Sequence, residues 1–236
     1  DPTRAADGRL AAAARLAAAF HAELAARLVA DTRIESALAF ADVSLKSHGS
    51  PQPARNADAI VRRAAMSLRR TVSTFAERER VVWSFEVVHC AGVLTGSVID
   101  AEDVVAIELA QLQTSLSDLR DEVETALAQA RGVLLFPSAD YPPKGPVVAI
   151  ASQGVESKNL IDVAHRIASA LGERLTVLTH GLAYDAAGFA TAIRHRRPVL
   201  AVAASSDPLA EEFLRRPRFL REMAAPLLLL KPEDKK

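Results

Sequence analysis

Short apolar runs alternate with longer amphipathic segments along the whole chain. The runs hold about four to eight residues and are rich in Val, Ile and Leu, which is typical of buried strands. Between them, apolar residues recur every three or four positions, as on one face of a helix. The runs predict strands over residues 24–29, 81–88, 104–107, 133–136, 147–150, 175–178, 198–203 and 227–230.

The amphipathic segments predict helices between these strands. Their ranges are 5–20, 57–75, 115–130, 160–171 and 186–193. In the second of these helices, four arginines lie between the apolar positions, which predicts a solvated face: Arg62, Arg63, Arg69 and Arg70.

Residues 141–146, with the sequence YPPKGP, form the clearest domain boundary, because this proline-rich segment is incompatible with a helix. One series of alternating strands and helices precedes it and another follows it. Such a pattern is typical of parallel strands with helices on both faces. We therefore expect an α/β protein with two tandem parallel sheets flanked by helices, one in residues 1–140 and a shorter one in 145–236. Ligands of such sheets bind at the carboxyl ends of the strands.

Charge and cysteine content narrow the function classes. The chain has 236 residues, with 29 Lys plus Arg balanced by 29 Asp plus Glu. This balance disfavours a nucleic-acid partner, because the arginines are interleaved with acidic residues and give no overall basic field. No apolar run reaches the roughly 18 residues that a membrane span requires. The single cysteine, Cys90, cannot form an internal disulfide and fits a reducing, cytoplasmic location.

Three stretches resemble the universal stress protein family. Residues 22–32, AELAARLVADT, are similar to the second strand of its proteobacterial members, and residues 83–88, WSFEVV, are similar to the third. Residues 145–150, GPVVAI, resemble the opening of a second copy. The resemblance implies a HUP-type fold, a parallel sheet flanked by helices that is usually dimeric. Members that bind ATP carry an Asp at the end of the first strand and the motif G-x2-G-x9-G, followed by Ser or Thr, after the fourth.

This sequence departs from that ATP-binding pattern. No glycine lies between Gly96 and Gly132, and none follows the strand predicted at 198–203. Asp1 matches the first-strand aspartate and is a candidate ligand-binding residue, but the strand that should precede it is missing or lies outside the sequence. The resemblance is therefore to a degenerate tandem member. We expect no cofactor, with ATP binding kept as an alternative.

Ser205 and Ser206 are the other ligand-binding candidates. They lie where the family places its phosphate loop, and the N-terminus of the following helix can hold a small anion. Ordinary capping is the alternative, since Asp207 should cap a helix that begins at Pro208. Pro217 should then kink or break this helix.

Other motifs indicate no chemistry. Residues 92–97, GVLTGS, lack the lysine of a P-loop and the spacing of a dinucleotide fingerprint, so a turn is the simpler interpretation. His165, His180 and His195 match no metal-ligand spacing. No nucleophile-elbow motif is present. We expect neither a catalytic residue nor a metal site.

The sequence thus predicts a non-catalytic stress-response or regulatory protein that acts by dimerisation or partner docking. A nucleotide-responsive switch is the alternative, and an adenylating or hydrolytic enzyme is a more distant one. The run Leu227–Leu230 should form a strand buried on both faces, with an edge that needs a partner. We expect it to lie beside residues 133–136 in an internal pseudo-dimer of the two halves. Formation of a homodimer, or binding of another protein, is kept as an alternative.

Overall fold

A computed structural model of the chain describes residues 2–31, 54–90, 99–108, 116–137, 144–152, 156–180 and 185–232. Two units are present: Asp1–Phe20 with Gly96–Lys236 form the larger, and His21–Thr95 form the smaller. Asp1 and the turn predicted at 92–97 lie outside the described residues, as do residues 141–143 of the segment 141–146.

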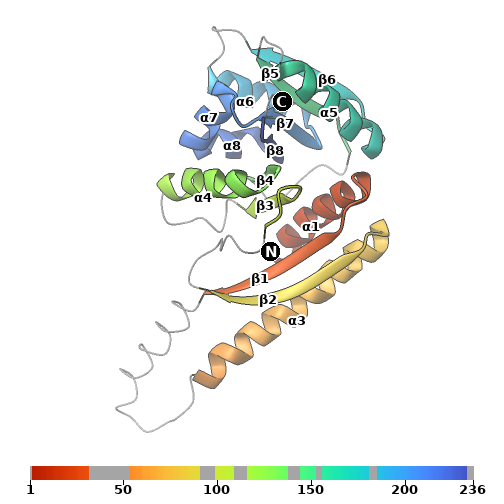
Figure 1. The fold of residues 1–236 in the computed structure, drawn as a ribbon, viewed down its shortest axis with the longest axis vertical. Coiled ribbons are helices and arrows are strands. Elements are labelled where there is room, and N and C mark those ends of the chain that lie inside the picture. The colour runs from red at the N-terminus through yellow and green to blue at the C-terminus, as the bar shows by residue number, and fades with distance from the viewer. Residues whose placement is uncertain are drawn as a thin grey trace. The chain divides into compact units, whose positions relative to one another are not determined.

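The larger unit is built on a six-stranded sheet with the strand order β3-β4-β8-β7-β5-β6 (Figure 1). Its strands coincide closely with the predicted apolar runs. Neighbouring strands are parallel except for β4 and β8, which are antiparallel. The strands are β3 (Val104–Glu108), β4 (Gly132–Phe136), β5 (Val147–Ser152), β6 (Leu175–His180), β7 (Leu200–Ala204) and β8 (Leu227–Leu230).

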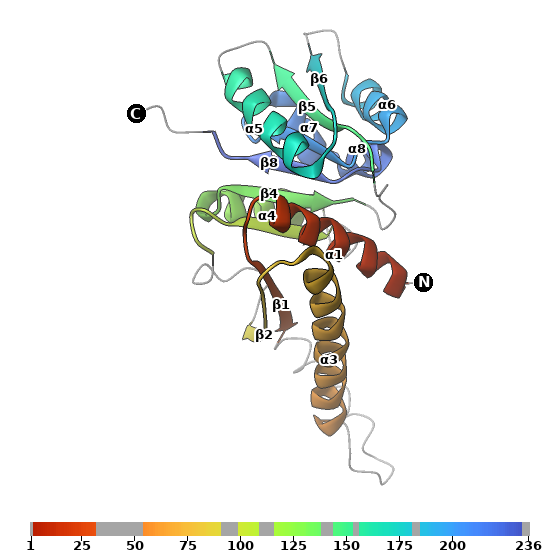
Figure 2. The ribbon, with the colours of Figure 1, turned by 90° about the vertical axis from the view of Figure 1, so that its right-hand side faces the viewer.

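Helices cover both faces of this sheet, as the sequence predicted. On one face, α1 and α5 pack over alternate strand residues such as Val147 and Ala149 (Figure 2). Val148 and Ile150 point to the other face and are equally buried. None of the helices in the described ranges is long and apolar enough to cross a membrane. The helices of this unit are α1 (Pro2–Ala19), α4 (Leu116–Gln129), α5 (Glu156–Leu171), α6 (Ala186–Arg196), α7 (Pro208–Arg215) and α8 (Pro217–Met223).

The antiparallel pair of β4 and β8 lies in the middle of the sheet. Val133 pairs with Leu229 and Leu134 with Leu228, so the predicted proximity of residues 133–136 and 227–230 is confirmed. The two backbones approach closely, because a Cβ atom added at Gly132 would lie 2.8 Å from the Leu229 carbonyl oxygen. The strand β8 therefore has a hydrogen-bonded neighbour at each edge and a covered surface on each face.

The division into units differs from the predicted boundary at residues 140–145. The strands β3 and β4 precede that boundary, yet they share one sheet with β5 to β8, which follow it. The physical reason is the β4–β8 pairing, which joins the two series edge to edge. The units divide instead after Phe20 and after Thr95.

The smaller unit holds a second, two-stranded parallel sheet and one long helix. Its elements are β1 (Leu24–Asp31), α3 (Ala54–Glu79) and β2 (Trp83–Cys90). The strands are in register from Leu24 opposite Trp83 to Asp31 opposite Cys90. Arg27 and Glu86 form an ion pair of 2.8 Å across the strands. The helix packs on this sheet, and its Val72 and Ala76 are fully buried.

Replacing both Leu228 and Leu229 with Lys tests the β4–β8 junction. The two side chains are 2% and 0% exposed, so the variant would bury two ammonium groups without partners. Loss of a buried leucine alone costs about 2–5 kcal/mol, and an unpaired buried charge costs several more. Because domains are stable by only about 5–15 kcal/mol, we expect the double variant to unfold or aggregate in circular dichroism and urea titrations.

Val177→Lys is the matched control for that change. Val177 lies on the edge strand β6 and is 39% exposed, so the free energy of unfolding should change by less than about 1 kcal/mol. A Leu228→Lys, Leu229→Lys variant that stayed folded and only changed its oligomeric state would contradict the internal role of β8.

Gly132→Ala tests the close approach of the same two strands. The added methyl group meets a backbone oxygen, which cannot move aside without disturbing the pairing, so we expect a loss of about 1–3 kcal/mol in urea denaturation. Gly188→Ala is the control, because its Cβ atom would meet only the side-chain oxygen of Asp185, at 3.1 Å. Equal stabilities of the two variants would show that the strand backbones have room to separate.

Candidate functional site

The carboxyl ends of β5, β6 and β7 form the edge at which a parallel sheet of this kind binds ligands. The connection that leaves β5 leads to its neighbour β6, whereas the connection that leaves β7 leads to β8 on the other side. Ser152 is the last residue of β5 and His180 is the last residue of β6. Ser205 and Ser206 follow β7 directly and therefore lie at this edge.

Ser205 and Ser206 form a tight turn between β7 and α7. The Asp207 N–H donates to the Ala204 carbonyl oxygen at 3.1 Å and closes the turn. The Ser205 N–H donates to the Leu230 carbonyl oxygen at 2.8 Å and extends the β7–β8 ladder by one residue. Ser206 is exposed and Ser205 is half-buried. Two backbone N–H groups of the turn thus already have partners within the chain.

The first N–H group of α7 also has a partner within the chain. The Asp207 carboxylate accepts a hydrogen bond from the Leu209 N–H at 2.8 Å, and Pro208 has no N–H to offer. The predicted cap at Asp207 and the predicted helix start at Pro208 are both confirmed. Phosphate loops bind anions through backbone N–H groups that have no other partner. In this turn the corresponding N–H groups, those of Asp207 and Leu209, already donate to acceptors within the chain.

His180 and Asp207 form a side-chain bridge across the end of β5. The His180 Nε2 atom lies 2.9 Å from both carboxylate oxygens of Asp207, which is only 4% exposed. Because β5 separates β6 from β7, this bridge joins the two strand ends on either side of it. A hydrogen bond to a carboxylate requires the proton on Nε2, so the network assigns that nitrogen as the donor.

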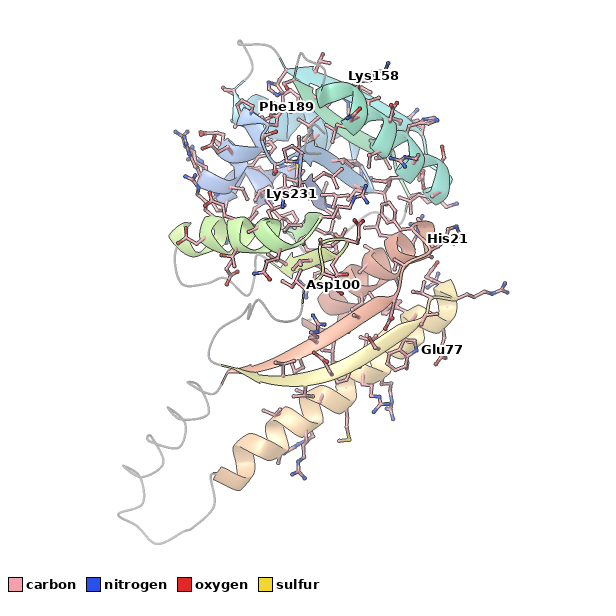
Figure 3. All side chains as sticks on the ribbon, viewed as in Figure 1. His21, Glu77, Asp100, Lys158, Phe189 and Lys231 are labelled. Carbon is pink, nitrogen blue, oxygen red and sulfur yellow. The ribbon has the colours of Figure 1, made fainter. Side chains whose placement is uncertain are left out.

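An aromatic contact holds the imidazole in place. Phe189 of α6, labelled in Figure 3, meets the His180 ring edge to face, with centroids 5.9 Å apart. Phe189 is buried, so it fixes one side of the ring while Asp207 fixes its Nε2 atom. The Asp207 carboxylate is therefore held by two donors, the His180 Nε2–H and the Leu209 N–H. The imidazole is held by Asp207 and by Phe189, so both side chains have defined orientations.

Sequence reasoning missed this bridge. It considered His180 only as a metal ligand and Asp207 only as a helix cap, because the pair is 27 residues apart and belongs to no local motif. A histidine that ends one strand and an aspartate that follows the next strand are the signal that could have indicated it. In the described ranges, no cluster of three or more His, Cys, Asp or Glu residues could hold a metal ion.

No family model matches the sequence, and no curated protein matches it. Solved structures do. One is from Pseudomonas aeruginosa UCBPP-PA14 and is described as a universal stress protein; it is 15% identical, with a TM-score of 0.50, over 90% of this chain and 94% of that one. A protein of unknown function from Pseudomonas aeruginosa PAO1 gives the same identity and TM-score, over 90% and 93% of the two chains.

These likenesses establish the class of fold. The chain is a mixed α/β protein whose mainly parallel sheets are flanked by helices, as in universal stress proteins. The resemblance drawn from residues 22–32, 83–88 and 145–150 is therefore confirmed at the level of the fold. The roles predicted for Asp1, Ser205 and Ser206 in ligand binding stay predictions.

Asp207→Ala tests the bridge. It removes the cap of α7, which is worth about 0.5–2 kcal/mol, and the partner of a mostly buried imidazole, worth about 1–3 kcal/mol more. We expect a total loss of about 2–4 kcal/mol in urea denaturation.

Asp185→Ala is the matched control. Asp185 caps α6 through the Gly188 N–H but is exposed, and it makes no ion pair or histidine contact with the residues that the structure describes. It should show only the loss of a cap, about 0.5–2 kcal/mol. Equal losses for the two variants would show that the His180 hydrogen bond adds nothing to stability.

Proposed function

We propose that this chain is a non-catalytic stress-response or regulatory protein that acts by docking on a partner. The observation that carries the proposal is the bridge between His180 and Asp207. It spans the end of β5, where a sheet of this kind would otherwise open a ligand crevice. The buried Asp207 carboxylate also opposes a phosphate at this position, since two like charges in a site with little solvent repel strongly.

The turn before α7 supports the absence of a nucleotide cofactor. A phosphate group gains its binding energy at a helix N-terminus from free N–H groups and the helix dipole. In this turn the N–H groups of Ser205, Asp207 and Leu209 donate within the chain. A phosphate bound by these three N–H groups would therefore have to break existing hydrogen bonds before making its own.

The β4–β8 junction supports an internal pseudo-dimer. In the family resemblance, the last strand of one copy pairs with the same strand of another copy. The last predicted strand of the first half, β4, pairs antiparallel with the last strand of the second half, β8. Within one chain the partner strand has an effective concentration of about millimolar, so this pairing leaves no edge for a second chain at β4 or β8. A homodimer would have to use another surface.

A nucleotide-responsive switch is the second candidate. The position of Ser205 and the exposed Ser206 at the carboxyl edge favours it, since hydroxyl groups there could contact a ribose or a phosphate. Under this alternative the His180–Asp207 bridge must open when the ligand enters.

Thermal unfolding with Mg–ATP, Mg–ADP and cyclic dinucleotides separates the two candidates. A ligand at 100 times its Kd stabilises the folded state by about 2.7 kcal/mol, which raises the Tm by several degrees. We expect no shift for any of the three. Sedimentation velocity in the same buffer should give a monomer. A clear rise in Tm with saturating ATP would overturn the first candidate in favour of the switch.

A further inference from the structure

One side of α3 presents four guanidinium groups and, between Asp58 and Glu77, no carboxylate. Arg62, Arg63, Arg69 and Arg70 are all exposed, and residues 59–76 contain neither Asp nor Glu. Seven residues make almost two helical turns, so the first arginine pair lies on the same side as the second, about 10.5 Å away along the axis. We call these four arginines, together with Met66 between them, the arginine face.

The guanidinium groups supply the free hydrogen-bond donors of this face. The neighbouring hydroxyl groups of Thr71, Ser73 and Thr74 donate to backbone carbonyls three or four residues earlier, at 2.9–3.1 Å. Among the described residues, no carboxylate pairs with any of the four arginines, and only Arg63 makes a hydrogen bond, a long one of 3.5 Å to its own helix. Glu77, labelled in Figure 3, lies two turns beyond Arg70 and bounds the face.

Met66 adds an apolar element at the centre of the face. It lies four residues after Arg62 and three before Arg69, so it is on the same side of the helix, and it is 66% exposed. The packing of α3 on the small sheet is made by other side chains, among them the fully buried Val72 and Ala76. The methionine is therefore not required for the core of the unit.

The chemistry of this face matches a surface that offers phosphates above an apolar layer. Planar guanidinium groups bind phosphate oxygens through paired hydrogen bonds. An exposed methionine between them gains only if it enters apolar surroundings. A nucleic-acid backbone supplies the phosphates without the apolar layer, whereas an anionic lipid bilayer supplies both. We propose that the arginine face binds the surface of an anionic phospholipid membrane.

The zero net charge of the chain determines the orientation in which α3 can bind a membrane surface. Without an overall positive field, attraction arises only from the local patch and acts within a Debye length of about 8–10 Å. The helix must therefore lie flat on the surface, with the two arginine pairs at the level of the phosphates. Each basic residue near an anionic bilayer raises the binding constant about fivefold.

Co-sedimentation of the full chain with lipid vesicles tests the proposal. We expect binding to vesicles of phosphatidylcholine with one third phosphatidylserine, weakened by added salt, and no binding to pure phosphatidylcholine. The double variant Arg62→Gln, Arg69→Gln should bind about 25-fold more weakly, from about fivefold for each arginine. The control Arg166→Gln, Arg174→Gln makes the same charge change at exposed positions of the larger unit and should bind as the unchanged chain does.

Met66→Gln and a DNA duplex separate a membrane from a nucleic acid. Met66→Gln should weaken vesicle binding a few-fold without changing its dependence on salt. A labelled DNA duplex should not bind at the same salt concentration. Duplex binding that depends on Arg62 and Arg69 but not on Met66, without binding to vesicles, would assign the face to nucleic acid and overturn the proposal. Absence of vesicle binding, or equal binding to neutral vesicles, would also overturn it.

Discussion

The antiparallel pairing of β4 with β8 is the interaction on which the larger unit depends. Each strand would otherwise end a parallel sheet with a row of unpaired N–H and C=O groups beside a run of apolar side chains. Pairing satisfies both rows at once. It also makes the core continuous, since Leu134 of β4 and Leu228 of β8 belong to the same buried cluster as Val147 and Val202.

The same strand supports the geometry of the carboxyl edge. At the end of β8, the Leu230 carbonyl oxygen accepts from the Ser205 N–H and so holds the turn that follows β7. That turn places Asp207 at the start of α7, and Asp207 then binds His180 from the end of β6. The position of the bridge thus follows from the pairing at the centre of the sheet through a short series of hydrogen bonds.

Local sequence patterns predict most of the fold but only part of the candidate site. The run Leu227–Leu230 has no polar alternation, so a strand buried on both faces was the expected outcome, and Asp207 before Pro208 is a local signal for a helix start. The division into units was not predictable in this way. It depends on which distant edges pair, and an apolar strand such as residues 132–136 has the same pattern at the edge of one sheet as inside a larger one. The His180–Asp207 bridge is likewise a product of strand order, which residue spacing does not encode.

The turn before α7 shows how one physical requirement allows two functional outcomes. The first N–H groups of any helix lack intrahelical partners and must find acceptors elsewhere. A glycine-rich turn leaves them to an external anion, which makes a phosphate site. The sequence Ser-Ser-Asp-Pro at 205–208 instead satisfies the Leu209 N–H with the carboxylate of Asp207 and removes another N–H with proline. A nucleotide phosphate would compete with an acceptor that is covalently held in place, already bonded to His180 and itself negatively charged. A turn of this kind in place of a glycine loop therefore exchanges acceptance of an external anion for a rigid helix start.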